Sequence, residues 1–333
     1  MQIKQPSRLR LLTCNVWSGL NYRGILAVGK HPQDAQHRYR ALLEEILALC
    51  PDIIALQEAN PLPQYAHKIA ADLGYTAVHQ ILIGGIRIGR LGIPGNLRQG
   101  EVLLAGKPWT IRGVQGQRLS GKGIVCNSVC CHINETRKAM LATVDINGTP
   151  LNVYIVHLHA GPHHGAAYAA SLARLRREFP ADIVSNAVAA AELAIARRRS
   201  ELNKLAGFIR KTLPPGRQAV ILGDFNTSSE SGDLDVLLAG GDWIDTFRKC
   251  NPAEPGYTWD PDNNSNFRLD IGAVTPYGQF CNHHDCHPHR FDYIMAYRTF
   301  TPDDIIESRV VFNDSTSPPP SDHYGLLTEL RWR

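Results

Sequence analysis

Polar side chains that could bind a metal ion or transfer a proton border apolar, strand-like runs at five places in this chain. The tetrapeptide Gly223-Asp224-Phe225-Asn226 comes directly after the apolar run 219–222. The other four places are Asn15 after residues 11–14, Gln57-Glu58 after 53–56, His157 after 153–156, and the turn Ser321-Asp322-His323 before 324–327. A polar group at the end of a buried strand is held by the sheet yet reachable from solvent. The sequence therefore predicts one active site built from distant segments.

The side chains at these places divide into oxygen donors and imidazoles. Carboxylate and amide oxygens suit a hard cation such as magnesium, manganese or calcium, rather than zinc. His157 and His323 are then the candidates for transferring protons or stabilising charge. A lone histidine is more often structural, but two histidines beside oxygen donors at strand ends indicate catalysis. The oxygen donors are Asn15, Glu58, Asp224, Asn226 and Asp322.

The composition is that of an ordinary globular protein. With 333 residues, of which 44% are hydrophobic and 20% charged, the chain can bury a full core and make one large domain or two small ones. The net charge of +4 favours an anionic substrate but is too small to predict nucleic acid as the partner. The chain opens without a signal-peptide stretch, and no apolar run has membrane-spanning length. We therefore expect a cytoplasmic protein by default, or a secreted one if a leader has been trimmed.

The cysteines do not predict a disulfide scaffold, because eight in a chain of this length mostly occupy positions that suit a small buried residue. The exception is the segment 281–289, in which Cys281 and Cys286 stand among four histidines. Thiols and imidazoles both suit zinc, but the spacing matches no familiar zinc finger. We predict a surface loop with one local disulfide or none. A zinc at this loop is the alternative, to which Cys126, Cys130 and Cys131 could contribute.

Helices and strands are predicted along the first half of the chain. Residues 35–49 have the apolar spacing of an amphipathic helix that Pro51 stops, and a second helix spans about 62–73 and ends at Gly74. The apolar stripe of the first helix is Leu42, Leu43, Ile46, Leu47 and Leu49. Strand-like runs lie near 75–83, 100–105, 109–115, 122–132 and 139–146.

An Ala-rich helical insertion at about 163–212 separates the strand of His157 from the strand of Asp224. It carries two arginine clusters, Arg174, Arg176 and Arg177, then Arg197, Arg198 and Arg199. We predict two helices packed on the outside of a sheet with their arginines facing water. The alternative is a basic cap that captures a phosphate or contacts an anionic membrane surface.

Six motifs, in order, resemble those of the endonuclease/exonuclease/phosphatase superfamily. They are Asn15, Gln57-Glu58, His157-Leu158, Gly223-Asp224-Phe225-Asn226, Arg290-Phe291-Asp292-Tyr293-Ile294 and Ser321-Asp322-His323, and the resemblance spans residues 11 to 330. It implies one α/β domain over residues 1–333, a four-layer α-β-β-α sandwich of two packed mixed β-sheets flanked by helices, as in deoxyribonucleases and sphingomyelinases. It also implies a hydrolase that cleaves a phosphate ester with Mg²⁺, or with Mn²⁺ or Ca²⁺ as alternatives.

The resemblance assigns metal binding to three positions. Glu58, aided by Asn15, would hold the cation, which neutralises the phosphate and the departing oxygen. Asp322 would complete the polar shell near this metal.

The resemblance also assigns catalysis to five positions. Asp224 and Asn226 would orient the attacking water and the phosphoryl group, and His157 would donate a hydrogen bond to the developing charge. His323 would be the general base, polarised by Asp292. In-line displacement by water then needs no covalent intermediate.

Three local features are similar to the sphingomyelinase-like branch of the superfamily. They are Gly121-Lys122-Gly123-Ile124, the segment 257–264 with its Thr258-Trp259-Asp260, and the segment 321–325. They predict Lys122, Asn226 and Trp259 as substrate contacts, with Lys122 as a second cation on the phosphate. Neither the exposed apolar hairpin of the secreted bacterial enzymes nor the membrane segments of the animal enzymes are evident in the sequence.

The substrate class therefore has alternatives. The first is a nuclease that contacts the phosphates of DNA or RNA through Arg and Lys, although the basic residues cluster on one insertion and do not alternate with stacking aromatics. A phosphatase acting on a small soluble ester and a non-catalytic binding module are further alternatives. The sequence gives no signal for the oligomeric state.

Overall fold

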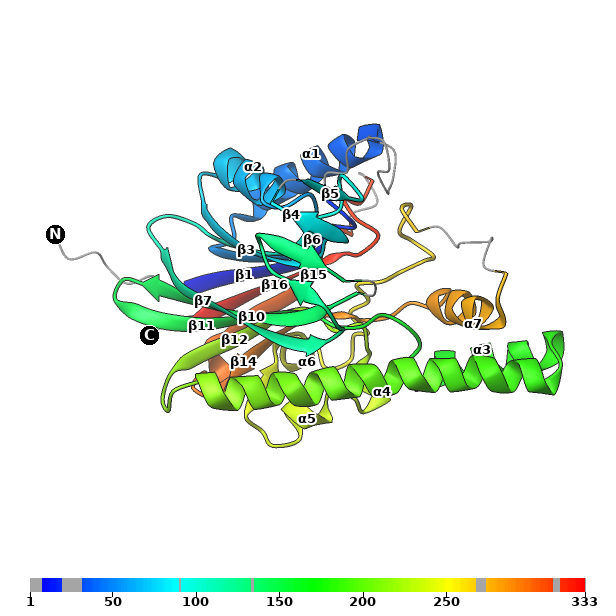
Figure 1. Ribbon diagram of the computed structural model, residues 1–333. Coiled ribbons are helices and arrows are strands. Elements are labelled where there is room, and N and C mark those ends of the chain that lie inside the picture. The colour runs from blue at the N-terminus through cyan, green and yellow to red at the C-terminus, as the bar shows by residue number, and fades with distance from the viewer. Residues whose placement is uncertain are drawn as a thin grey trace.

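Two six-stranded mixed sheets pack face to face in the computed structural model, which describes residues 8–19, 32–89, 91–132, 135–267, 274–313 and 318–332 (Figure 1). The first sheet has the order β15 (Ile305–Val311), β16 (Gly325–Arg331), β1 (Arg8–Asn15), β2 (Ile53–Ala59), β6 (Gln99–Ala105) and β3 (Thr76–Ile83). The second has the order β13 (Trp243–Asp245), β14 (Asp292–Tyr297), β12 (Gln218–Asp224), β11 (Thr149–His157), β10 (Arg137–Ile146) and β7 (Thr110–Ser120).

The core lies between the facing sheets, and helices cover their outer faces. Alternate residues of the central strands, such as Leu11, Ile53 and Val220, meet in one buried cluster between the sheets. Helices α1 (Pro32–Leu49) and α2 (Gln64–Leu73) cover the first sheet, whereas α4 (Ala181–Thr212) crosses the second (Figure 1). The central strands are apolar on both faces because both are covered, and the predicted four-layer sandwich is confirmed.

The predicted helices agree closely with the structure. Helix α2 ends at Gly74, whose φ of 71° is left-handed, as the glycine stop predicts. The apolar stripe of α1 is narrower than predicted, since Leu42 and Ile46 are buried but Leu47 is 52% exposed. No described helix is long and apolar enough to cross a membrane.

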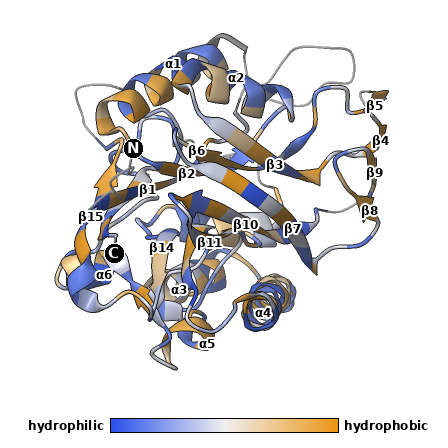
Figure 2. Cartoon of the chain, turned by 90° about the vertical axis from the view of Figure 1, so that its left-hand side faces the viewer, coloured by the Kyte–Doolittle hydropathy of each residue, from blue (hydrophilic) through white to orange (hydrophobic). Residues whose placement is uncertain are grey.

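A small third sheet, not predicted as a unit, has the order β5 (Leu91–Ile93), β4 (Ile86–Ile88), β9 (Val129–Cys131) and β8 (Ile124–Val125). The predicted run 122–132 supplies two of its strands. Figure 2 places this sheet at one edge of the molecule, outside the two large sheets. Five of its apolar side chains are between 60% and 83% exposed: Ile86, Ile88, Leu91, Ile93 and Ile124. We call it the apolar edge sheet.

The insertion forms two helices, α3 (Ala166–Glu178) and the 32-residue α4. One end of α4 extends past the sheets, where α3 and α7 (Pro276–Asp285) pack against it in a separate apolar cluster (Figure 1). The predicted surface loop at 281–289 is therefore partly wrong, since it begins as the second half of α7. Cys281 and Cys286 are free thiols, which agrees with the predicted loop that has no disulfide. The remaining described helices of four or more residues are the short α5 (Asp235–Leu238) and α6 (Thr246–Cys250).

The arginines of α3 face water, as predicted, but Arg198 of α4 does not, because it is fully buried. Its guanidinium donates to the carbonyl oxygens of His159 and Gly161 at 3.2 Å and of Pro162 at 2.8 Å, and it lies 3.5 Å from the Asp233 carboxylate. The rigid fork of five N–H donors allows one side chain to hold three carbonyls. Arg198 therefore fixes the segment that leaves the strand of His157.

Replacing Arg198 with alanine should lower the free energy of unfolding by about 3–5 kcal/mol, because it leaves three carbonyls without their donor and removes one of the two guanidinium partners of the buried Asp233. Urea denaturation measures this. Arg177→Ala, at an exposed position on α3, is the control and should change stability by less than about 0.5 kcal/mol. Equal effects of the two substitutions would contradict a structural role for the buried guanidinium.

Candidate active site

The strand register brings together most of the predicted residues. In the second sheet, His157 of β11 pairs with Asp224 of β12, and Asp224 pairs with Asp292 of β14. In the first sheet, Asn15 of β1 pairs with Gln57, so Glu58 comes one residue further along β2. Side chains of directly paired residues project from the same face. His157, Asp224 and Asp292 therefore form a row of acid/base groups on the second sheet. On the first sheet, strict alternation would turn Glu58 away from Asn15, but Glu58 has a left-handed φ of 59° and accepts from the Asn15 amide at 3.3 Å, so the two residues form an oxygen-donor pair.

Asn15 links the two sheets through its amide. Its Nδ2 donates to Glu58 Oε1 at 3.3 Å and to Asp224 Oδ2 at 3.1 Å, while its Oδ1 accepts from the backbone N–H of Trp17 at 3.0 Å. The other oxygen of Glu58 accepts from the N–H of Ser18 at 3.2 Å. As a metal ligand, Asn15 would offer its oxygen, which requires a half-turn of the amide plane.

The tetrapeptide after β12 depends on two backbone conformations. Gly223 has a φ of 151°, and a Cβ there would collide with the carbonyl of Val156 on β11. Asn226 has a φ of 50°, a left-handed conformation that asparagine tolerates. Its N–H donates to Asp224 Oδ1 at 2.9 Å and its Nδ2 to the carbonyl of Leu158 at 3.0 Å. The predicted pair Asp224 and Asn226 is therefore locked by local hydrogen bonds.

The two histidines differ in charge because their neighbours differ. Nδ1 of His323 lies 2.9 Å from Asp292 Oδ2, and its Nε2 lies 4.0 Å from Asp224 Oδ2. Burial lowers the pKa of His323, but Asp292 and Asp224 outweigh it and raise the pKa to about 10. Burial and Arg137 instead hold the pKa of His157 well below its ordinary value. At pH 7 one ring is therefore a cation and the other is neutral.

Asp224 lies between these rings. Its Oδ2 is 3.5 Å from His157 Nε2. Burial raises the pKa of Asp224 to about 7, an effect that Asp292 reinforces and His323 opposes. Titratable groups with pKa values pushed apart at one site are the hallmark of acid/base catalysis.

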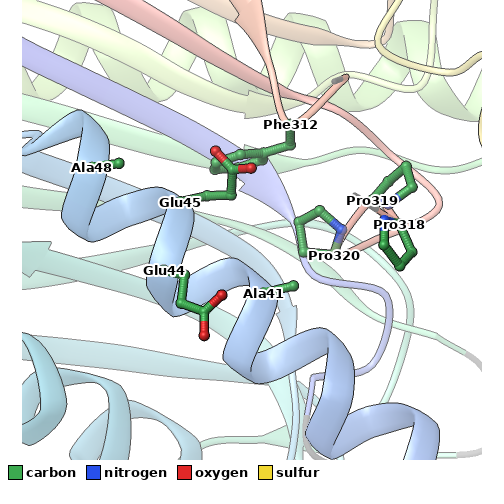
Figure 3. A pocket seen from close by; sticks show the side chains of 8 residues that line it. All are labelled: Ala41, Glu44, Glu45, Ala48, Phe312, Pro318, Pro319 and Pro320. Carbon is green, nitrogen blue, oxygen red and sulfur yellow. The ribbon is translucent and has the colours of Figure 1, made fainter. Parts of the chain in front are cut away.

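The turn that carries His323 is held from both sides. Asn264 and Asn266 donate to the carbonyl of Ser321 at 3.0 and 3.2 Å. The prolines just before it, 318–320, line a small pocket of about 200 Å³ against α1 (Figure 3). No predicted catalytic residue lines this pocket, so it is separate from the candidate active site.

The three remaining predicted residues, Trp259, Asp322 and Lys122, differ in how closely they approach His323. Trp259 forms a wall, since its ring lies edge-on to His323 at 5.1 Å between centroids and its Nε1 donates to the carbonyl of Asp285. Asp322 is half-buried, accepts from the hydroxyl of Ser321 and contributes to the raised pKa of His323. Lys122 is exposed between β7 and β8 and contacts none of the described catalytic side chains.

Two buried charged residues beside His157 were not predicted. Glu101 is fully buried on β6, where burial holds the pKa of its carboxyl well above the ordinary value, and it accepts from Gln80. Arg137 is 4% exposed at the start of β10 and contributes to the low pKa of His157. A charged residue within an apolar strand run, as in Gly100-Glu101-Val102, is the signal that could have identified Glu101.

The donor set fits a hard divalent cation. Glu58 is 22% exposed and can receive a ligand from solvent, and Asn15 and Asp224 add oxygen atoms beside it. Oδ1 of Asp292 is buried with no hydrogen-bond partner among the described residues. Closely spaced buried carboxylates with few cationic partners favour an added positive charge.

Comparisons with known proteins match this chain to a family and to solved structures of similar fold. The model of the Endonuclease/Exonuclease/phosphatase family matches residues 12–323. None of the curated protein sequences matches significantly.

Among solved structures, a humanized D. rerio TDP2 is 16% identical with a TM-score of 0.60, covering 98% of this chain and 100% of that chain. The mannosyl-6-phosphatase Bt3783 of Bacteroides thetaiotaomicron is 14% identical with a TM-score of 0.59, covering 97% and 100%. An endonuclease/exonuclease/phosphatase from Beutenbergia cavernae is 19% identical with a TM-score of 0.56, covering 98% and 72%. At these identities the likeness is one of fold.

Replacing Asp292 with asparagine should lower the pKa of His323 from its value of about 10, because it removes the carboxylate that raises this pKa most. NMR titration of the metal-free protein measures the imidazole directly. Asp303→Asn, at an exposed position, should leave it unchanged. An unaltered pKa in Asp292→Asn would contradict the ion pair as its cause.

The raised pKa of His323 also affects the stability of the fold. A pKa raised in the folded state contributes stability that is complete below the unfolded value of about 6.5 and is lost as pH rises through the folded value. The stability advantage of the wild type over Asp292→Asn should therefore narrow as pH rises from about 6.5 towards 10.

Proposed function

The chain belongs to the endonuclease/exonuclease/phosphatase family and is a metal-dependent phosphoric ester hydrolase, and we propose that it is a phosphodiesterase of the sphingomyelinase or phospholipase C type. The observation that supports this finer proposal is the apolar edge sheet, an exposed hydrophobic surface whose chain leads directly to the strand end of Glu58. The catalytic roles come first, because any substrate must satisfy them.

We propose that Glu58 and Asn15 hold the divalent cation, with Asp322 nearby. When bound, such a cation, Mg²⁺ in the simplest case, would supply positive charge that neutralises the phosphate and the departing oxygen. His157, kept neutral by burial, donates a hydrogen bond to a phosphoryl oxygen as negative charge builds there.

Asp224 and Asn226 orient the water that attacks in line with the departing oxygen. His323 then accepts the proton of this water at Nε2, while Asp292 holds Nδ1 at 2.9 Å and fixes the ring. The base must be neutral to act, and positive charge held at Glu58 favours that form by opposing the carboxylates that raise the pKa of His323.

The segment that joins the apolar edge sheet to β6 passes the strand end of Glu58. The backbone N–H of Arg98, directly before β6, donates to Asn60 Oδ1 at 2.8 Å, and the N–H of Leu62 donates to the carbonyl of Arg98. The chain that leaves the edge sheet is therefore tied to the residues that follow the proposed metal ligand. Exposed Ile and Leu side chains grouped on one small sheet favour contact with a lipid surface.

Cations flank this hydrophobic surface. Lys122 is exposed two residues before Ile124, and the exposed Arg118 donates to the carbonyl of Gly123 at 2.7 Å. An apolar surface bordered by lysine and arginine suits a membrane interface, where the side chains enter the lipid and the cations meet phosphates. We propose that Lys122 contacts phosphate at this interface, whereas Trp259 contacts substrate beside His323.

The substrate class is tested by magnesium-dependent hydrolysis of sphingomyelin in vesicles, a soluble chromogenic phosphocholine ester, DNA and RNA. We expect release of phosphocholine by the wild type and a loss of about 10²–10⁴-fold in turnover in His323→Ala, which removes the base. Cleavage confined to nucleic acid would replace the proposal with the nuclease alternative. That outcome would leave the metal-dependent hydrolase intact.

Membrane contact is tested by the double substitution Ile88→Ser and Leu91→Ser. Each buried aliphatic side chain is worth about 1.5–3 kcal/mol, so hydrolysis of vesicle substrate should fall at least about tenfold. Turnover of the soluble ester should stay unchanged, since neither residue reaches the catalytic groups. Leu193→Ser, a similarly exposed position on α4, is the matched control. Equal losses on both substrates would contradict a role confined to the lipid surface.

A further inference from the structure

Three histidines that the active site does not use form a second buried cluster. They are His163, in the segment between β11 and α3, His284 near the end of α7, and His289 in the turn before β14. Each is less than 6% exposed. One nitrogen from each ring lies within 4.8 Å of the others.

The contacts inside this cluster are close. The facing nitrogens of His284 (Nε2) and His163 (Nδ1) are 3.0 Å apart. The ring centroids of His163 lie 4.4 Å from those of His284 and 4.7 Å from those of His289. Two nitrogens bound to one zinc at 2.0–2.1 Å in tetrahedral geometry are about 3.4 Å apart, so small ring rotations reach that geometry.

The polar atoms of the cluster are not all satisfied by protein. Nδ1 of His284 is buried without a hydrogen-bond partner among the described residues. Burial lowers the pKa of His284 to about 2 and that of His289 to about 4. The rings are therefore neutral, the form in which imidazole binds a metal.

A route from solvent reaches the cluster. His163 and His289 both line an open pocket of about 380 Å³, together with Ser228, Glu230 and Tyr257. A metal ion can enter through this pocket, and water there can fill a fourth coordination position.

We propose that His163, His284 and His289 bind a zinc ion, or another divalent transition metal that prefers imidazole, at a site separate from the magnesium-type site. Only nitrogen ligands are present in this cluster, whereas the active site offers mainly oxygen, so the two sites select different classes of cation. Cys281 and Cys286 belong to neither described metal-like group. The zinc ligands thus differ from those suggested by the Cys-rich segment alone.

The site joins three parts of the chain behind the catalytic turn. His289 stacks on Phe291 at 4.9 Å, and its backbone pairs with Trp259, the wall beside His323. His284 connects the site to α7, and His163 connects it to the segment that Arg198 holds. Zinc at this position would fasten the helical insertion to the back of the active site.

The test is zinc binding to metal-stripped protein with magnesium in large excess, measured by equilibrium dialysis. We expect one tightly bound zinc in the wild type and a weakening of more than about a hundredfold in His163→Gln, His284→Gln or His289→Gln, since each removes a direct ligand. His287→Gln, at an exposed position in the same segment, and Cys281→Ser should bind zinc as the wild type does.

Two outcomes would overturn the site: a wild type that binds no zinc under these conditions, or equal binding by the wild type and folded His284→Gln. Glu58→Gln should keep the zinc, which separates this site from the active-site cation.

X-ray absorption of the zinc-loaded wild type decides the ligands even if the variants fail to fold. Nitrogen and oxygen ligands at about 2.0–2.1 Å with imidazole scattering are expected, whereas sulfur at about 2.3 Å would overturn the assignment.

Discussion

The candidate active site is built around two acidic side chains, Asp224 and Asp292, which pair directly on adjacent strands and are almost completely excluded from water. Two carboxylates so placed repel one another and lose hydration, so a nearby positive charge stabilises them. The protonated ring of His323 supplies one such charge. A bound cation can supply another, which explains why an acid/base centre and an oxygen-donor pair occur together.

Much of this centre could be predicted because each residue stands beside a run of apolar residues that can only be a buried strand. The strand ends fixed the positions of Asn15, Glu58, His157 and Asp224 without knowledge of the sheet order. The difference in charge between the neutral His157 and the protonated His323 could not be predicted, because it depends on burial and on neighbours distant in sequence. Asp292 determines one of them across 31 positions of chain.

The differences from prediction also have physical causes. Strands of three residues, such as β4 and β5, are too short for periodicity to be recognised, so only the run 122–132 indicated any part of the apolar edge sheet. Within α4, Arg198 falls on the buried stripe of Ile195 and Leu202, whereas Arg199 does not. The carbonyls that accept from Arg198 belong to a segment 36 to 39 residues away, so its partners could not be predicted from the helix alone. Local patterns identify elements, whereas the partners of single polar groups come from the assembled fold.

Gly223 shows how an absent side chain can determine catalytic geometry. Its backbone lies against Val156, one residue before His157, at a distance that leaves no room for a Cβ. Any larger residue would have to push β11 and β12 apart, and the imidazole of His157 would move away from the carboxylate of Asp224. Gly223, which has no reactive group, therefore sets the distance between the imidazole of His157 and the carboxylate of Asp224.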